Sequence, residues 1–178
     1  KRTLILVDRS ASMLDETIVN VVRRKLMSSA QKQRAPKWQR TVRSVNWLIA
    51  NLQPGTQFQV YAFSTKAEPV LARTGGQWLS ADSQRDLDGT LTGLRSIVPE
   101  GGTSLHRAFR VPRLLSPRPD SIILITDGQQ TRGKRRPVEA AKLAAEWGIK
   151  IYSIGIGGGD AVTTQNSFIG QFLVGANP

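Results

Sequence analysis

Two short apolar segments that each end on an aspartate constrain the fold of this chain most strongly. The first reads T-L-I-L-V before Asp8, and the second reads S-I-I-L-I-T before Asp127. Apolar runs without alternation are typical of strands buried on both faces of a parallel sheet. Ligands of such sheets bind beyond the carboxyl ends of the strands. We therefore expect the two carboxylates to share one small site with the hydroxyls of Ser10 and Ser12.

Length and composition favour a single domain. With 178 residues, 39% of them apolar, the chain is long enough for one two-sided core and short for two. Its apolar runs are far shorter than the roughly 20 residues of a membrane-spanning helix, and no signal segment is recognisable. Because the chain begins directly on its first predicted strand, we expect it to be a fragment of a longer protein.

Charge and cysteine content narrow the classes of function. The formal net charge of +12 would concentrate acidic partners or polyanions near the domain through long-range attraction. The sequence has no cysteine, which excludes disulfide frameworks, thiolate metal sites and cysteine nucleophiles. Neither observation identifies the partner.

Helix and strand patterns alternate along most of the chain, which predicts an α/β fold with a mainly parallel sheet. Apolar residues at helical spacing predict helices at about 15–33, 37–52, 83–97, 105–115 and 137–147. Further strands are expected at 58–63 and 149–154, and a short hairpin or edge strand at about 70–79.

The segment D-R-S-A-S carries the strongest chemical signal. It places Asp8, Ser10 and Ser12 at i, i+2 and i+4 on a turning loop, so that three oxygen groups can converge on one point. Hard divalent cations such as Mg²⁺ prefer oxygen ligands in octahedral geometry and keep several waters. Two further oxygens are available from Thr103, which follows a Gly-Gly turn, and from Asp127 at the end of the second apolar strand.

At these residues the chain resembles the von Willebrand factor A (vWA) family. The metal-ion-dependent adhesion site (MIDAS) of that family has D-x-S-x-S on the first loop, a threonine on the second and an aspartate on the third. These positions match Asp8, Ser10 and Ser12, then Thr103 in G-G-T-S-L, then Asp127 in I-T-D-G. The segments F-Q-V-Y-A-F-S and A-A-E-W-G-I-K-I-Y-S-I-G-I-G also look like the family's middle strand and late helix-strand unit.

The resemblance implies both a fold and a mode of binding. The expected fold is a single Rossmann-like vWA domain over residues 1–178, with a mostly parallel central sheet, one short antiparallel edge strand and helices on both faces. In the family, the serines and the threonine contact the metal directly, the aspartates hold it largely through water, and an acidic side chain of a partner protein takes the open position. The expected cofactor is therefore Mg²⁺, or Mn²⁺ or Ca²⁺ in its place.

The chain departs from the family pattern around the first loop. Arg9 fills the variable position and Ala11 stands where glycine is common, which removes no ligand. Residues at about 15–36 look like a helical insertion that should border the site. Basic residues on this insertion and near both metal loops are expected to form a rim that attracts an acidic partner: Arg9, Arg23, Arg24, Lys25, Arg132, Lys134, Arg135 and Arg136.

Two other classes of function are open to this sequence. A basic surface can bind nucleic acid or another polyanion, with steep salt dependence and no need for metal. A strand-terminal aspartate with Mg²⁺ also serves aspartate-based phosphotransferases, but those enzymes generally place a second aspartate where this chain has Ser10. Since the sequence shows no nucleophile paired with a base, we expect a binding domain and not an enzyme.

The resemblance also suggests a cellular setting. Members of the family act in cell adhesion, in bacterial envelope proteins and beside ATPases that remodel complexes. This compact chain without cysteine looks bacterial. We expect a protein partner that offers an aspartate or glutamate, with an ATPase or an envelope complex among the candidates. A periplasmic or membrane-anchored envelope location is favoured over the cytoplasm.

Overall fold

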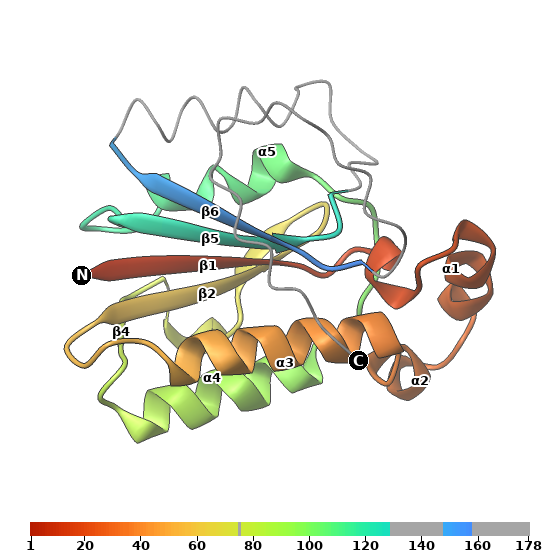
Figure 1. The fold of residues 1–178 in the computed structure, drawn as a ribbon, viewed down its shortest axis with the longest axis horizontal. Coiled ribbons are helices and arrows are strands. Elements are labelled where there is room, and N and C mark those ends of the chain that lie inside the picture. Colours follow the sequence, from red (N-terminus) through yellow and green to blue (C-terminus); the bar gives the residue numbers. More distant parts are fainter. Residues whose placement is uncertain (75, 129–147, 158–178) are drawn as a thin grey trace.

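The computed structural model describes residues 1–74, 76–128 and 148–157 (Figure 1). Its helices are α1 (Ile18–Lys25), α2 (Ser29–Gln33), α3 (Pro36–Ala50), α4 (Gln84–Ser96) and α5 (Leu105–Ala108), with short 3-10 helices η1 (Ala11–Leu14), η2 (Ala72–Thr74) and η3 (Val111–Arg113). Its strands are β1 (Arg2–Asp8), β2 (Gln57–Phe63), β3 (Ala67–Pro69), β4 (Leu79–Ser80), β5 (Ser121–Thr126) and β6 (Lys150–Gly155). The helix predicted at 137–147 lies outside the described residues.

The central sheet has the order β3-β2-β1-β5-β6, and β4 also pairs with β2. Strands β1, β2, β5 and β6 are parallel, whereas β3 and β4 run antiparallel to β2. The predicted α/β fold with a mostly parallel sheet and a short antiparallel edge is therefore confirmed. A hairpin within 70–79 is wrong, because that edge consists of two short strands, one at 67–69 and one at 79–80, that each pair with β2 and not with each other.

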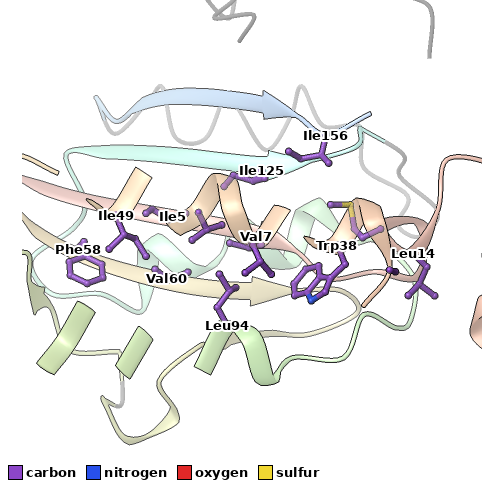
Figure 2. Packing of buried hydrophobic residues seen from close by; sticks show 14 of the residues in the cluster. Ile5, Val7, Leu14, Trp38, Ile49, Phe58, Val60, Leu94, Ile125 and Ile156 are labelled. Carbon is purple, nitrogen blue, oxygen red and sulfur yellow. The ribbon is translucent and has the colours of Figure 1, made fainter. Parts of the chain in front are cut away.

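The apolar core lies on both faces of the sheet, because successive side chains of a strand point to opposite faces. On one face, Ile5 and Val7 pack with Trp38 of α3 and Leu94 of α4 (Figure 2). On the other face, the alternate residues of β1 pack against α5, in a cluster that includes Leu4, Leu6, Phe63, Leu105 and Phe109. Each large side chain buried in this way contributes about 1.5–3 kcal/mol. The two-sided core holds the strand ends, and therefore the loops beyond them, in place.

The segment between η1 and α3 forms two short helices, so the single helix predicted at 15–33 is wrong. The second helix starts at Ser28, whose hydroxyl accepts a bond from the Gln31 N–H at 3.4 Å while the Gln31 side chain accepts from the Ser28 N–H at 3.0 Å. This capping box begins a new helix. Neither α1 nor α2 has a buried residue, and Figure 1 shows both beyond the carboxyl ends of the strands.

The helix predicted at 105–115 is also shorter than expected. It ends at Ala108 and is followed by η3. Pro112 explains the stop, because a proline ring clashes with the carbonyl of the residue four positions earlier in an α-helix. Among the described residues, no helix is long and apolar enough to cross a membrane.

Candidate metal site

The carboxyl ends of β1 and β5 bring the two carboxylates of the sequence motif to the same edge of the sheet. The two strands are parallel neighbours, with Val7 opposite Ile125. Asp8 therefore lies beside Thr126, whose hydroxyl donates to Asp8 Oδ2 at 2.8 Å. Asp127 follows directly in the chain. The sheet thus joins residues that are about two thirds of the sequence apart.

Asp8 is completely buried at the end of β1. Its Oδ1 accepts a hydrogen bond from the Ser10 N–H at 2.9 Å, and its Oδ2 accepts the Thr126 bond. Burial raises the pKa of the Asp8 carboxyl to about 6, although the hydrogen bonds from Ser10 and Thr126 act in the opposite direction. The cost of ionising Asp8 in this environment would fall if a cation were bound beside it.

Three hydroxyls meet on the outer side of Asp8. Ser10 Oγ lies 2.9 Å from Ser12 Oγ and accepts a hydrogen bond from Thr103 Oγ1 at 2.8 Å. Ser10 and Thr103 are buried, whereas Ser12 is partly exposed. Octahedral Mg²⁺ sites with metal-oxygen distances of 2.0–2.1 Å place neighbouring ligand oxygens about 3 Å apart. The two contacts are ordinary hydrogen bonds, and their lengths are also compatible with neighbouring oxygen ligands of one Mg²⁺.

Thr103 reaches the first loop because a glycine turn brings the second loop against it. Gly101 has a φ of 81°, a conformation that favours glycine, and its carbonyl accepts from the Ala11 N–H at 2.9 Å. The Ser104 N–H donates to the Ser64 carbonyl at 3.0 Å, which fixes the far side of the same loop. The hydroxyl of Thr103 is thus positioned by backbone contacts on both sides.

Asp127 interacts with a residue that the sequence analysis did not identify. The ammonium of Lys37, in the first turn of α3, donates to Asp127 Oδ2 at 2.8 Å. Only 3% of each side chain is exposed. The sequence offers only a weak signal for this contact: a basic residue in the first turn of a helix is opposed by the helix dipole, but many basic residues of this chain lie on predicted helices.

The structure brings four of the five predicted ligands into one hydrogen-bonded group and places the fifth beside it. Asp8, Ser10, Ser12 and Thr103 are linked to one another, whereas Asp127 is held by Lys37. The hydroxyl and carboxylate oxygens of these residues are of the kind that hard divalent cations prefer. Within the part of the chain that the structure describes, no group of three His, Cys, Asp or Glu side chains comes together. Three of the five predicted ligands are therefore hydroxyls. Hard cations that retain several waters can bind at a site with so few carboxylates.

The predicted rim is only partly brought to the site. Arg9 turns toward β3, where it lies 3.6 Å from Glu68, and Arg24 turns inward to pair with Asp15 at 2.8 Å. Arg23 and Lys25 are exposed on α1. The other predicted rim residues, Arg132, Lys134, Arg135 and Arg136, lie outside the described residues.

A pocket of about 480 Å³ opens between α1 and the loops that carry Ser10, Ser12 and Thr103. Its floor includes Ser10, Ser12 and Thr103, and one wall is formed by apolar and basic residues of α1. The wall includes Ile18, Val21, Val22 and Lys25. The hydroxyl cluster is therefore reached through a hollow with an apolar side.

Comparisons with known proteins agree with this geometry. A family model of the von Willebrand factor type A domain matches residues 3–130. No curated protein matches the sequence. The match covers the three loops that carry Asp8, Thr103 and Asp127.

Solved structures show the same fold. BatB, a conserved hypothetical protein from Bacteroides thetaiotaomicron, is 25% identical with a TM-score of 0.61, over 86% of this chain and 65% of its own. An aerotolerance-related membrane protein from Bacteroides fragilis is 22% identical with a TM-score of 0.64, over 94% of this chain and 75% of its own. Proximal thread matrix protein 1 from the mussel byssus, with a zinc-occupied MIDAS motif, is 19% identical with a TM-score of 0.55, over 86% of this chain and 37% of its own. The chain thus spans about two thirds of the length of the BatB structure.

Proposed function

The chain belongs to the von Willebrand factor type A family, and from this premise we propose that it is a divalent-metal-dependent binding domain that captures an acidic side chain of a partner protein. The observation that carries the proposal is the cluster of the Ser10, Ser12 and Thr103 hydroxyls at 2.8–2.9 Å, beside the buried carboxylate of Asp8. The cluster lies on loops and not in the apolar core, and all three of its residues line the pocket beside α1.

In this proposal the three hydroxyls would contact the metal directly, and Asp8 and Asp127 would support it from behind. The metal, when bound, supplies a concentrated positive charge that attracts a carboxylate. Because hydroxyls are neutral ligands, they leave more of that charge for the partner than carboxylate ligands would. The donor chemistry favours Mg²⁺ or Mn²⁺, with Ca²⁺ as a larger alternative. The zinc-occupied motif of the byssus protein supports the use of a divalent metal at this position of the fold.

The surroundings of the hydroxyl cluster suit an acidic partner segment with apolar neighbours. The pocket beside the cluster has the exposed Ile18 and Val22 on its wall, with Lys25 close by. The acidic residues of this region are already engaged, because Asp15 pairs with Arg24 and Glu16 contacts Arg40. A partner carboxylate would therefore meet little uncompensated negative charge on its way to the metal.

Binding and not catalysis is the proposed activity. The proposed ligands include no histidine or cysteine, and their hydroxyl and carboxylate oxygens suit a hard cation better than they suit nucleophilic catalysis. We further propose a bacterial envelope setting, where an acidic surface of an envelope protein or an associated ATPase would be the partner. The likeness to the membrane protein of Bacteroides fragilis supports this setting.

Isothermal titration calorimetry with Mg²⁺ and Mn²⁺ tests the metal site. We expect wild type to bind, and Asp8→Asn and Ser12→Ala to bind at least about tenfold more weakly. The matched controls are Asp88→Asn and Ser29→Ala, which make the same chemical changes on α4 and α2. Equal binding by wild type and both site variants would refute the proposal.

A second titration tests partner capture and the rival polyanion function. A peptide that contains a glutamate should bind the domain only when metal is present, and its glutamine analogue should not. Retention on heparin that depends steeply on salt and not on metal would favour the polyanion binder instead.

A further inference from the structure

The ammonium of Lys37 occupies a built site among the loops that carry the metal ligands. Its three N–H groups match three acceptors: Asp127 Oδ2 at 2.8 Å, the Ser12 carbonyl at 3.1 Å and the Asp15 carbonyl at 3.3 Å. A lysine ammonium has three donors and no acceptor, so this set uses all of its bonding capacity. With 3% of the side chain exposed, Lys37 is a buried cation and not a surface lysine that happens to reach the site.

From this arrangement we propose that Lys37 is an internal counter-cation of the metal site. It holds the first and third loops together when no metal is bound, and it leaves the metal-loaded site with an extra positive charge. Lys37 therefore weakens binding of the metal and strengthens binding of the partner's carboxylate. This inference rests on the proposed metal-dependent function and assigns a role to a residue outside the donor set.

The loop-joining role follows from the connections that Lys37 makes. Ser12 belongs to η1 on the first loop, whereas Asp127 follows β5 on the third loop. The lysine itself is anchored, because it lies in the first turn of α3 next to the buried Trp38. One side chain on a rigid helix therefore contacts both loops at once. A metal-free site organised in this way needs no rearrangement of these two loops when the cation arrives.

The charge at the site determines the second part of the proposal. Asp8 and Asp127 contribute two negative charges and Lys37 one positive charge. Among the described residues, the other charged side chain close to Lys37 is Glu16 at 3.6 Å, which also contacts Arg40, whereas Asp15 meets Lys37 only through its backbone carbonyl. With the Glu16–Arg40 pair neutral, these groups and a bound dication leave the loaded site with one net positive charge. Without Lys37 the loaded site would be neutral.

These charges have opposite effects on the two ligands. A buried cation repels a dication that binds next to the same carboxylate. At the low effective dielectric of a buried site, this repulsion lowers the affinity for the metal several-fold or more. The same excess charge attracts a carboxylate. Removing Lys37 should therefore tighten metal binding and weaken capture of an acidic peptide, a combination that a purely structural lysine would not produce.

The test compares wild type with Lys37→Met, which keeps most of the length of the side chain and removes its charge. We expect Lys37→Met to bind Mg²⁺ and Mn²⁺ about tenfold more tightly by calorimetry, and to bind a glutamate-containing peptide about tenfold more weakly at saturating Mn²⁺. In urea unfolding, the variant should be destabilised relative to wild type in EDTA, and most of that loss should disappear in saturating Mg²⁺. Lys66→Met, at an exposed lysine, is the control for the change in net charge.

Each outcome has a separate meaning. Unchanged or weaker metal binding by Lys37→Met overturns the inference and leaves the proposed function intact. If neither protein binds metal, the proposed function fails, and so does this inference. Metal binding by the variant alone would refute the proposed function of the wild type, and it would overturn the inference as well, because the wild type would then have no loaded site for a carboxylate. An equal loss of stability with and without Mg²⁺ would also overturn it, because Lys37 would then be only a structural link.

Discussion

Replacing Asp8 with asparagine should change how the stability of the metal-free domain depends on pH. Burial raises the pKa of Asp8 from 3.8 to about 6, so the folded state binds this proton more tightly than the unfolded chain does. Protonated Asp8 therefore favours folding, and its ionisation opposes folding. The stabilising contribution is complete below pH 3.8 and is lost as the pH rises through about 6.

The size of the effect follows from the pKa difference. About two pKa units, at about 1.4 kcal/mol per unit, correspond to about 3 kcal/mol for this fully buried group. The asparagine side chain of the Asp8→Asn variant would keep the bond from the Ser10 N–H and could donate to the Thr126 hydroxyl, but it does not titrate. Relative to Asp8→Asn, the wild type should therefore gain up to about 3 kcal/mol as the pH falls from 7 to below 4.

Urea unfolding of both proteins in EDTA between pH 4 and 8 measures this difference. Other carboxyl groups titrate in both proteins and cancel when the two free energies of unfolding are subtracted. Adding Mg²⁺ at pH 8 should stabilise the wild type by about 2.7 kcal/mol at 100 times its dissociation constant, and should stabilise Asp8→Asn by no more than about 1.4 kcal/mol at the same Mg²⁺ concentration. A difference that is flat with pH in EDTA, or that grows toward high pH, would refute this account of Asp8.

Three further changes test the surroundings of the site. Thr103→Val should weaken Mg²⁺ binding at least tenfold in calorimetry. It should also lower the free energy of unfolding in urea by about 1–2 kcal/mol, because it removes a buried donor to Ser10. Full metal affinity in this variant would exclude Thr103 as a ligand. Replacing residues 17–34 with a short Gly-Ser linker should leave a folded, metal-binding domain with altered peptide preference. Neither α1 nor α2 has a buried residue, and a short linker can bridge the gap because the Asp15 carbonyl is already hydrogen-bonded to Lys37. An unfolded circular dichroism spectrum would contradict this expectation. The pair Ile18→Ser and Leu26→Ser should change the free energy of unfolding by less than about 0.5 kcal/mol, because these side chains are 77% and 89% exposed, while weakening the binding of an apolar acidic peptide; a large loss of stability would place them in the core.

Much of the fold and of the donor set can be predicted from the sequence, because the signals are local. The apolar runs before Asp8 and Asp127 mark buried parallel strands, and parallel strands end at the same edge of a sheet. The hydroxyls of Ser10 and Ser12 follow the first strand at fixed spacing. Residue type and position relative to a strand end are therefore sufficient to place these oxygens together.

Other features depend on packing between elements that are distant in the sequence. The residues of the capping box at Ser28 can be seen in the sequence, but the apolar residues around them follow one helical spacing. Helical spacing alone does not show where one helix stops and another starts. Burial depth determines the raised pKa of Asp8, and no residue pattern reports that depth.

Lys37 illustrates the difference most clearly. In the sequence it is one basic residue among many, on a chain whose formal net charge is +12. The tertiary structure places its ammonium against Asp127, 90 positions away, and removes both from water. Sequence determined which oxygens could bind a cation. Only the packing of α3 against the strand ends decided that a cation of the protein's own lies beside them, because contacts of that kind are set by the relative positions of whole elements and not by neighbouring residues.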